Sequence, residues 1–264
     1  AVGCFIYKVT DLIRSVLGKS KNTDTAAIVL AAGRSTRMGS DTPKQLIEIN
    51  GVPVLIHSLR AFENSHYIRK IVLVVPSGEE SVYRALCKAH GIKKLSDVVA
   101  GGETRNASAA NGFKKIGADI PYVAIHDAAR CLVTAELIDR VCAAAVRYNA
   151  ATAATRSVDT VKISGKNKFI DHTEARNHVW LAQTPQVFLS DLYRAASYIA
   201  DQSSFIPTDD NMLIENVKHK VRLVECGKFN IKITTPNDLI LAKAILDART
   251  AGEEEDLPED SQED

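Results

Sequence analysis

The chain has 264 residues, of which 45% are hydrophobic and 25% charged, and its formal net charge is +1. This composition is typical of a globular protein, and no apolar run approaches the roughly 18 residues that a membrane-spanning helix needs. The five cysteines (Cys4, Cys87, Cys131, Cys142, Cys226) are scattered and form no CxxC pair. This pattern argues against a disulfide framework or a zinc site and favours a reducing compartment, which we expect to be the cytoplasm.

The charge is unevenly distributed along the chain. Residues 253–264 hold eight acidic residues and no basic one, so removing them from a net charge of +1 leaves +9 on the preceding 252 residues. A basic body suits anionic ligands, and we expect the tail, 251–264, to be disordered. Only 6% of residues are aromatic, so we predict no nucleic-acid partner.

We interpret the first 25 residues as an extension that precedes the main domain. Ile6, Val9, Leu12 and Ile13 recur at helical spacing, which predicts an amphipathic helix. Charged residues interrupt its apolar run too often for a signal peptide. Three interpretations remain open: a helix packed on the body, a helix that contacts a partner or a membrane surface, and a presequence remnant of a protein of an organellar stroma.

Between residues 26 and 250 we predict one domain in which strands and helices alternate. In chain order, the predicted strands are 26–31, 69–75, 96–99, 121–126, 150–155 and 221–224. The predicted helices are 53–64, 78–90, 104–117, 134–147, 189–200 and 236–248. Thr134 and Thr235, the latter before Pro236, are predicted helix starts. This alternation favours a mainly parallel sheet covered by helices on both faces.

Residues 157–181 break the alternation. The segment is polar and contains the turn signal Ser164-Gly165-Lys166-Asn167, which predicts a β-hairpin. A hairpin this polar does not belong in a core, so we expect it to project from the body as an arm that a second subunit covers.

The first predicted strand leads into a loop that carries glycines and cations, AAGRSTRMGSDTPKQ, up to Gln45. A buried strand followed by such a loop is how α/β proteins present backbone N–H groups to phosphate. The loop matches neither GxxxxGK[ST] nor GxGxxG, which excludes a Walker A site and argues against a dinucleotide-dependent dehydrogenase. A flexible surface loop with solvated charges is the alternative.

Further polar clusters follow later strands, and each has a simpler interpretation. Residues 101–108, GGETRNAS, could approach a flat ligand or simply cap a helix. Residues 126–130, HDAAR, place Asp127 at a strand end, where it could hold Mg²⁺ or form a surface ion pair. Lys232 alternates with apolar neighbours as on a strand, which also describes a solvated lysine. Residues 207–210, PTDD, precede a helix predicted to end near residue 216, and capping explains only part of this acidic run.

These blocks together resemble the 2-C-methyl-D-erythritol 4-phosphate cytidylyltransferases of the nucleotidyltransferase superfamily. The resemblance covers residues 25–248 and rests, in the family's order, on LAAGRSTRMGSDTPKQ, GGETRNAS, HDAAR, VDTVK, ARNHVWLAQTPQVF, TDDNMLIE and NIKITTPNDL. It implies transfer of CMP from CTP to 2-C-methyl-D-erythritol 4-phosphate in the non-mevalonate isoprenoid pathway. The fold we expect is α/β, with a Rossmann-like, mainly parallel sheet, helices on both faces and a projecting β-hairpin arm.

The resemblance also implies roles for particular residues. Arg37, Lys44 and Lys232 would be the catalytic cations that bind the triphosphate, and Asp127 would hold Mg²⁺ or another divalent cation. The CTP-binding residues would be Ala31, Ala32, Gly33, Gly102, Glu103, Ser108 and Asp127. The acceptor phosphate would be bound by Thr160, Arg176 and Arg130, with Arg105 nearby; the first two lie on the arm, which in this family reaches into the partner subunit of a homodimer.

Two positions depart from the family's pattern. Cys131 follows HDAAR where the family usually has proline, and Asn106-Ala107 stands where a more acidic pair is common. The second departure falls in the loop implied to recognise the base.

Two alternative functions remain. A ribitol-5-phosphate cytidylyltransferase would share the CTP chemistry; Asn106 favours it, whereas Ala32, Ala129 and Trp180 favour methylerythritol phosphate. A non-catalytic nucleotide-binding regulator of the same fold should have lost the cations of the triphosphate site, which this chain keeps.

Overall fold

The computed structural model describes residues 22–33, 43–203 and 205–252. The helix predicted in residues 1–25 and the acidic tail predicted in 251–264 fall almost wholly outside the described residues, as does Arg37. Within the described part, no helix is both long enough and apolar enough to cross a bilayer.

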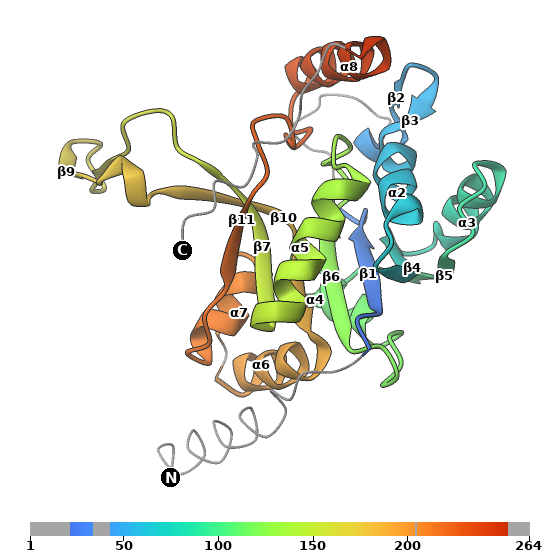
Figure 1. Cartoon of the computed structure of the whole chain (residues 1–264), viewed down its shortest axis with the longest axis horizontal. Coiled ribbons are helices and arrows are strands. Elements are labelled where there is room, and N and C mark those ends of the chain that lie inside the picture. The colour runs from blue at the N-terminus through green and yellow to red at the C-terminus, as the bar shows by residue number, and fades with distance from the viewer. Residues whose placement is uncertain (1–21, 34–42, 204, 253–264) are drawn as a thin grey trace.

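The described residues form a seven-stranded sheet in the order β11-β7-β10-β6-β1-β4-β5 (Figure 1). β10 pairs antiparallel with both β6 and β7, while the other neighbouring pairs are parallel. The mainly parallel sheet is therefore confirmed. The strands are β1 (Thr25–Leu30), β4 (Ile68–Val75), β5 (Leu95–Ala100), β6 (Tyr122–Asp127), β7 (Ala150–Arg156), β10 (Trp180–Leu189) and β11 (Arg222–Glu225).

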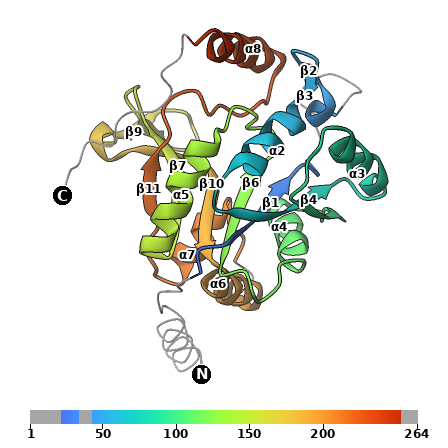
Figure 2. The same cartoon turned by 45° about the vertical axis from the view of Figure 1, so that its right-hand side comes forward.

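Helices cover both faces of the sheet. α2 and α5 contact each other in front of the strands in Figure 1, and α4 and α6 pack behind them, where Phe113 meets Tyr193 at 5.0 Å between ring centroids. Figure 2 shows the same layering from another side. The helices are α2 (Val54–Asn64), α3 (Glu80–Ala89), α4 (Arg105–Phe113), α5 (Ala135–Tyr148), α6 (Ser190–Ser203), α7 (Asp210–Asn216) and α8 (Pro236–Ala251).

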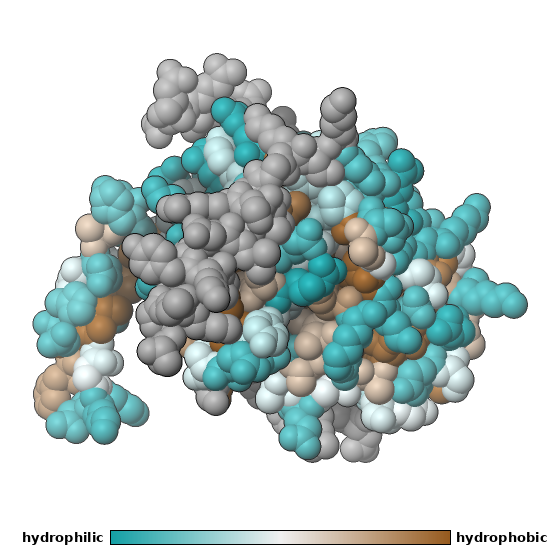
Figure 3. Space-filling model, turned by 90° about the horizontal axis from the view of Figure 1, so that it is seen from below, coloured by the Kyte–Doolittle hydropathy of each residue, from teal (hydrophilic) through white to brown (hydrophobic). Residues whose placement is uncertain are grey.

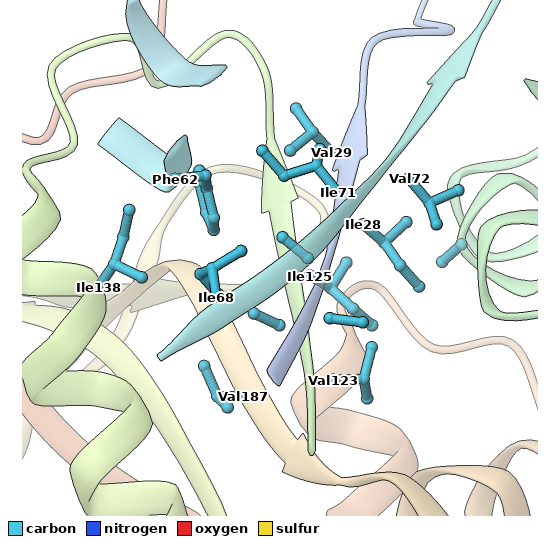
Figure 4. Close-up of a cluster of buried hydrophobic side chains, with 14 of the residues drawn as sticks. Ile28, Val29, Phe62, Ile68, Ile71, Val72, Val123, Ile125, Ile138 and Val187 are labelled. Atoms are coloured by element: carbon cyan, nitrogen blue, oxygen red, sulfur yellow. The ribbon is translucent and has the colours of Figure 1, made fainter. Parts of the chain in front are cut away.

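The core lies between these layers. β1 is TAAIVL and is buried on both faces, with Ile28 and Val29 fully inaccessible. Figure 4 shows these two side chains among Ile71, Val72 and Ile125 from the neighbouring strands. Burying a side chain of this size is worth about 1.5–3 kcal/mol relative to exposing it, so the central strands supply much of the stability that holds the strand ends in place.

The predicted helix starts are confirmed by their hydrogen bonds. The Thr134 side chain accepts from the backbone N–H of Leu137, and Thr235 with Asp238 forms a capping box ahead of Pro236. Asp209, of the acidic run, caps α7 by accepting from the N–H of Met212 at 3.1 Å.

Two local features differ from what the sequence pattern suggests. No strand was predicted for most of β10, because Gln183, Thr184 and Pro185 interrupt its apolar pattern; tertiary contacts hold this strand in the sheet nonetheless. Lys232 does not lie on a strand, because the segment 228–234 runs as a loop from β11 toward α8. Its apolar neighbour Ile233 is buried in a small cluster under α8 rather than in a sheet.

The arm projects as predicted. β8 (Lys162–Ser164) and β9 (Ile170–Thr173) form a separate two-stranded antiparallel sheet, which lies well to the left of the body in Figure 1. A short 3-10 helix, η2 (Arg176–His178), leads back to β10. Near the body's opposite side, η1 (Lys44–Leu46) precedes the small hairpin of β2 (Glu48–Ile49) and β3 (Val52–Pro53).

Candidate active site

A pocket of about 690 Å³ opens where β1, β5 and β6 end. These three strands are parallel and end at the same edge of the sheet, the position at which α/β proteins bind ligands. Segments far apart in the chain meet there. Its lining residues are Leu30, Ala32, Gly33, Lys44, Gln45, Gly102, Glu103, Thr104, Arg105, Ser108, Asp127, Ala129 and Lys232.

Asp127 is the carboxylate in this pocket that meets two cations. It is the last residue of β6 and pairs in register with Leu30 at the end of β1. Lys232 Nζ donates to its Oδ2 at 2.6 Å, and Arg105 Nε donates to its Oδ1 at 3.2 Å. Burial by itself would raise the pKa of Asp127, but the charges of Arg105 and Lys232 outweigh it and hold that pKa well below its usual range. The carboxylate is therefore ionised at neutral pH.

Arg105 joins Asp127 to a second carboxylate outside the pocket. Its Nη1 donates to Asp210 Oδ2 at 2.5 Å, and Asp210 is fully buried. Burial would lower the pKa of Arg105, but Asp210 and Asp127 outweigh it and raise that pKa, so the guanidinium stays charged. Sequence reasoning noted the acidic run around Asp210 without finding this contact, because the partners are 105 positions apart in the chain.

Lys232 is held by its neighbour in the chain. Ile233 is fully buried under α8, and its N–H donates to the carbonyl of Ala129 at 2.8 Å. Lys44 Nζ donates to the carbonyl of the same Ile233 at 3.0 Å. The two lysines therefore come from opposite ends of the chain and meet at one side of the pocket.

Gln45 shapes the loop after β1. Its side chain is almost fully buried, and Nε2 donates to the carbonyls of Ala31 at 2.9 Å and Gly33 at 3.1 Å. The N–H of Ala31 donates to Val74, so both backbone groups of Ala31 are already used within the chain. Ala32 and Gly33 line the pocket. Gln45 was missed because a lone glutamine carries no signal without knowledge of the carbonyls that it meets.

The loop after β5 is folded by its own residues. A Cβ on Gly101 would lie 2.4 Å from Ala32 Cβ, and one on Gly102 would lie 2.5 Å from Ala107 Cβ, so both positions require glycine. Ser108 is buried, and its Oγ accepts from the N–H of Gly102 at 3.0 Å and donates to the carbonyl of Thr104 at 2.9 Å. In this geometry Ser108 holds the loop, while Glu103 is exposed at the pocket's edge.

The two departures from the family's pattern point away from the pocket. Asn106 Nδ2 donates to the carbonyl of Pro207 at 2.9 Å, which fastens the start of α4 to the segment before α7. Cys131 is buried with Ile233 in the cluster under α8. Neither residue lines the pocket.

Three residues predicted to bind the acceptor do not line this pocket within the described part of the chain. Thr160 and Arg176 lie on the exposed arm, where Arg176 Nη1 donates to the carbonyl of Val158 at 3.0 Å. Arg130 Nη1 donates to the carbonyl of Asn230 at 2.8 Å, which steadies the segment that carries Lys232.

Behind Asp127 lies a buried hydrogen-bond chain that sequence reasoning did not single out. His126 Nε2 lies 3.3 Å from the carbonyl of Arg130, so this nitrogen carries the proton, and Thr184 Oγ1 donates to Nδ1 at 3.0 Å. The same Thr184 oxygen accepts from the N–H of Asp127 at 3.1 Å. Burial lowers the pKa of His126 to about 3, so the ring is neutral. The polar interruption of β10 thus fixes the backbone of Asp127.

The donor set fits a divalent cation bound together with phosphate. No group of three or more histidines, cysteines or carboxylates that could hold a metal occurs among the described residues. Mg²⁺ is commonly bound through one or two carboxylates, with substrate phosphates supplying the remaining oxygens. The ionised Asp127 carboxylate facing the pocket meets that requirement.

Comparison with known proteins decides the family. The family model described as IspD, 2-C-methyl-D-erythritol 4-phosphate cytidylyltransferase, matches residues 25–248. The chain belongs to this family. The resemblance noted in the sequence is therefore confirmed, over the same residues.

Relatives and solved structures of the IspD family agree. The 2-C-methyl-D-erythritol 4-phosphate cytidylyltransferase of Pelotomaculum thermopropionicum is 43% identical over 85% of this chain and 94% of its own length. That of Syntrophus aciditrophicus is 42% identical over 83% and 94%. The crystal structure of 4-diphosphocytidyl-2C-methyl-D-erythritol synthase from Anaerococcus prevotii superposes with a TM-score of 0.76 at 32% identity, covering 85% of this chain and 96% of that one. The α/β fold expected from the sequence is thereby confirmed.

Proposed function

We propose that this protein transfers CMP from CTP to 2-C-methyl-D-erythritol 4-phosphate, giving 4-diphosphocytidyl-2-C-methyl-D-erythritol and pyrophosphate. Membership of the IspD family supports this activity. The observation that carries it is the meeting of Asp127, Lys232 and Lys44 at one pocket, since this chemistry needs cations and a metal-binding carboxylate beside a triphosphate.

The reaction is an in-line displacement at the α-phosphorus of CTP. A phosphate oxygen of the acceptor forms the new bond to that phosphorus while the bond to the bridging oxygen of pyrophosphate breaks. The acceptor phosphate is already ionised near neutral pH, so no strong general base is needed. The barrier lies in bringing two polyanions together, and cations positioned in advance lower it.

The chain's own residues supply this positioning. In the free protein Lys232 and Asp127 neutralise each other. When nucleotide binds, Lys232 turns to phosphate oxygens, joined by Lys44 and, as the family resemblance implies, by Arg37. Asp127 would then hold Mg²⁺ or another divalent cation, which when bound neutralises phosphate charge. Arg105 stays on Asp127 Oδ1 and keeps its orientation.

Cytosine and ribose would be bound by the loops after β1 and β5. Ala32, Gly33, Gly102 and Glu103 line this part of the pocket, and Ser108 keeps the second loop folded. Backbone groups in a loop closed by internal hydrogen bonds suit a flat base, because its edge needs donors and acceptors at fixed positions.

The acceptor would be held partly by the arm of a second subunit. The arm and its base expose apolar side chains: Val158, Phe169, Ile170 and Leu181. Figure 3 shows hydrophobic surface, in brown, on the arm at the left of the view. Phe169 is 79% exposed, which is unusual for a side chain of that size. A homodimer that covers these residues would bring Thr160 and Arg176 to the partner's pocket.

The alternative acceptor, ribitol 5-phosphate, is less well supported, because the relatives described above are named for methylerythritol phosphate. The non-catalytic alternative is disfavoured by the presence of Lys44, Asp127 and Lys232 at one pocket. We propose a cytoplasmic location, which cell fractionation would test.

An assay of pyrophosphate release tests the proposal. Purified protein should release pyrophosphate from CTP with 2-C-methyl-D-erythritol 4-phosphate when Mg²⁺ is present, and EDTA should abolish the signal. Ribitol 5-phosphate should be turned over at least about a hundredfold more slowly, which corresponds to about 2.7 kcal/mol of discrimination between the two acceptors. Preference for ribitol 5-phosphate, or no release with either acceptor, would contradict it.

A further inference from the structure

Asp210 is a buried carboxylate to which the proposed reaction gives no role. It begins α7 and is fully inaccessible to solvent. Tyr193 OH donates to its Oδ1 at 2.8 Å, Arg105 Nη1 donates to its Oδ2, and its own N–H donates to Gln186 Oε1 at 3.0 Å. A buried charge requires a partner of opposite sign, so Asp210 and Arg105 depend on each other.

Arg105 carries the influence of Asp210 to the pocket. Its Nε faces Asp127 and its Nη1 faces Asp210, so one guanidinium bridges a pocket carboxylate and a buried one. With Lys232 on the other oxygen of Asp127, two cations face two carboxylates. We call these four residues the charge cluster. Without the charge of Asp210, the charge cluster would carry one net positive charge directly behind Asp127.

We propose that Asp210 is a positioning residue that neutralises Arg105, so that Asp127 can accept a divalent cation and Arg105 does not bind the triphosphate itself. This inference rests on the proposed function of the pocket. Loss of the Asp210 charge should weaken the contribution of metal to CTP binding and strengthen metal-free CTP binding. A general loosening of the structure would weaken CTP binding both with and without metal. Stronger metal-free binding together with a smaller gain from metal therefore identifies an electrostatic role.

The experiment is calorimetric titration of CTP into Asp210→Asn and wild-type protein, in Mg²⁺ and in EDTA. We expect the ratio of the dissociation constant in EDTA to that in Mg²⁺ to fall about tenfold in the variant, since one unit charge in a partly buried site is worth at least that. The dissociation constant in EDTA should itself decrease. A wild type that binds CTP in neither condition would contradict the proposed function, whereas an unchanged ratio or weaker binding in both conditions would overturn only the role of Asp210.

Tyr193→Phe is the matched control, because it removes a hydrogen bond to the same carboxylate without changing any charge. Its ratio should stay within about twofold of wild type. The double variant Arg105→Gln/Asp210→Asn removes both charges together and should return the ratio to within about threefold of wild type. If Asp210→Asn alone does not fold, Arg105→Gln carries the test, because removing the charge that Asp210 neutralises should move the ratio in the opposite direction, upward. A ratio that falls as far in the double variant as in the single variant would overturn the proposal.

Discussion

The pocket and the arm differ in whether residues of the same chain satisfy their polar groups and cover their apolar side chains. Around the pocket, side chains and backbone groups pair within the chain: Gln45 holds two carbonyls, Ser108 holds the loop after β5, and Asp127 meets two cations. On the arm, Phe169 and Ile170 are 79% and 64% exposed. The pocket is therefore assembled by folding, whereas the arm has the exposed apolar surface expected of the dimer contact proposed above.

The largest effect should come from the pocket. Lys44→Ala should lower kcat with methylerythritol phosphate by about a hundredfold or more, because one pre-positioned charge donor is lost from the transition state. Steady-state kinetics would measure this. Lys243→Ala on α8, whose ammonium is exposed and pairs with Asp247, is the control and should keep wild-type turnover. Near-normal turnover of Lys44→Ala would rule out the proposed role.

The second prediction is that the arm of one subunit completes the active site of its partner. Arg176→Ala should lower activity by about tenfold or more, since it removes a charged contact to the acceptor phosphate. Co-expression with Lys44→Ala should then restore about a quarter of wild-type activity, because random pairing puts one intact site in each mixed dimer. Activity that stays at the level of the two separate variants would mean that the arm serves its own chain or none.

Replacing Gln45 should lower activity less than replacing the cations of the pocket. It should affect both the shape of the loop after β1 and the free energy of unfolding. Gln45→Leu leaves the carbonyls of Ala31 and Gly33 without their donor, which should cost about 1–3 kcal/mol of unfolding free energy. It should also raise the KM for CTP more than it lowers kcat. Urea unfolding and steady-state kinetics would measure the two effects. A stable variant with unchanged KM would show that the loop keeps its shape without this side chain.

The fourth prediction concerns the pH dependence of stability. The pKa of His126 is lowered from 6.5 to about 3 in the folded protein, so the folded state takes up its proton later than the unfolded state as pH falls. The contribution of neutral His126 to the free energy of unfolding is therefore fully present above pH 6.5. It is lost as pH falls from 6.5 toward 3, by at most about 1.4 kcal/mol per pH unit. His126→Gln should unfold with a shallower dependence in this window, measured by urea titrations at several pH values. An unchanged slope would contradict neutral burial of the ring.

Features of the fold and of the pocket could be predicted from the sequence where the residues that determine them are close together in the chain. The buried strand β1, the caps at Thr134 and Thr235, and Asp127 at a strand end were all readable, because their partners lie within a few residues or follow from strand order. The projecting hairpin was readable from its polarity. The family resemblance supplied the roles of the cations.

Long-range contacts could not be predicted. Thr184 lies in β10, whose polar residues interrupt the apolar pattern by which a strand is predicted. It nevertheless forms hydrogen bonds with His126 and with the backbone of Asp127. The alternation around Lys232 fits a strand, whereas burial of Ile233 beneath α8 fixes a loop. In each case the deciding partner is more than 50 positions away in the chain, or belongs to another layer of the fold.

The most direct test of the account follows the phosphorus atoms of CTP. With methylerythritol phosphate, Mg²⁺ and CTP labelled at the α-phosphate, the label should appear in the diphosphocytidyl product; with CTP labelled at the γ-phosphate, it should appear in pyrophosphate. Lys232→Ala should slow both to the same extent. Transfer of the γ-label to the acceptor, or release of the α-label as free CMP, would contradict cytidylyl transfer at this pocket.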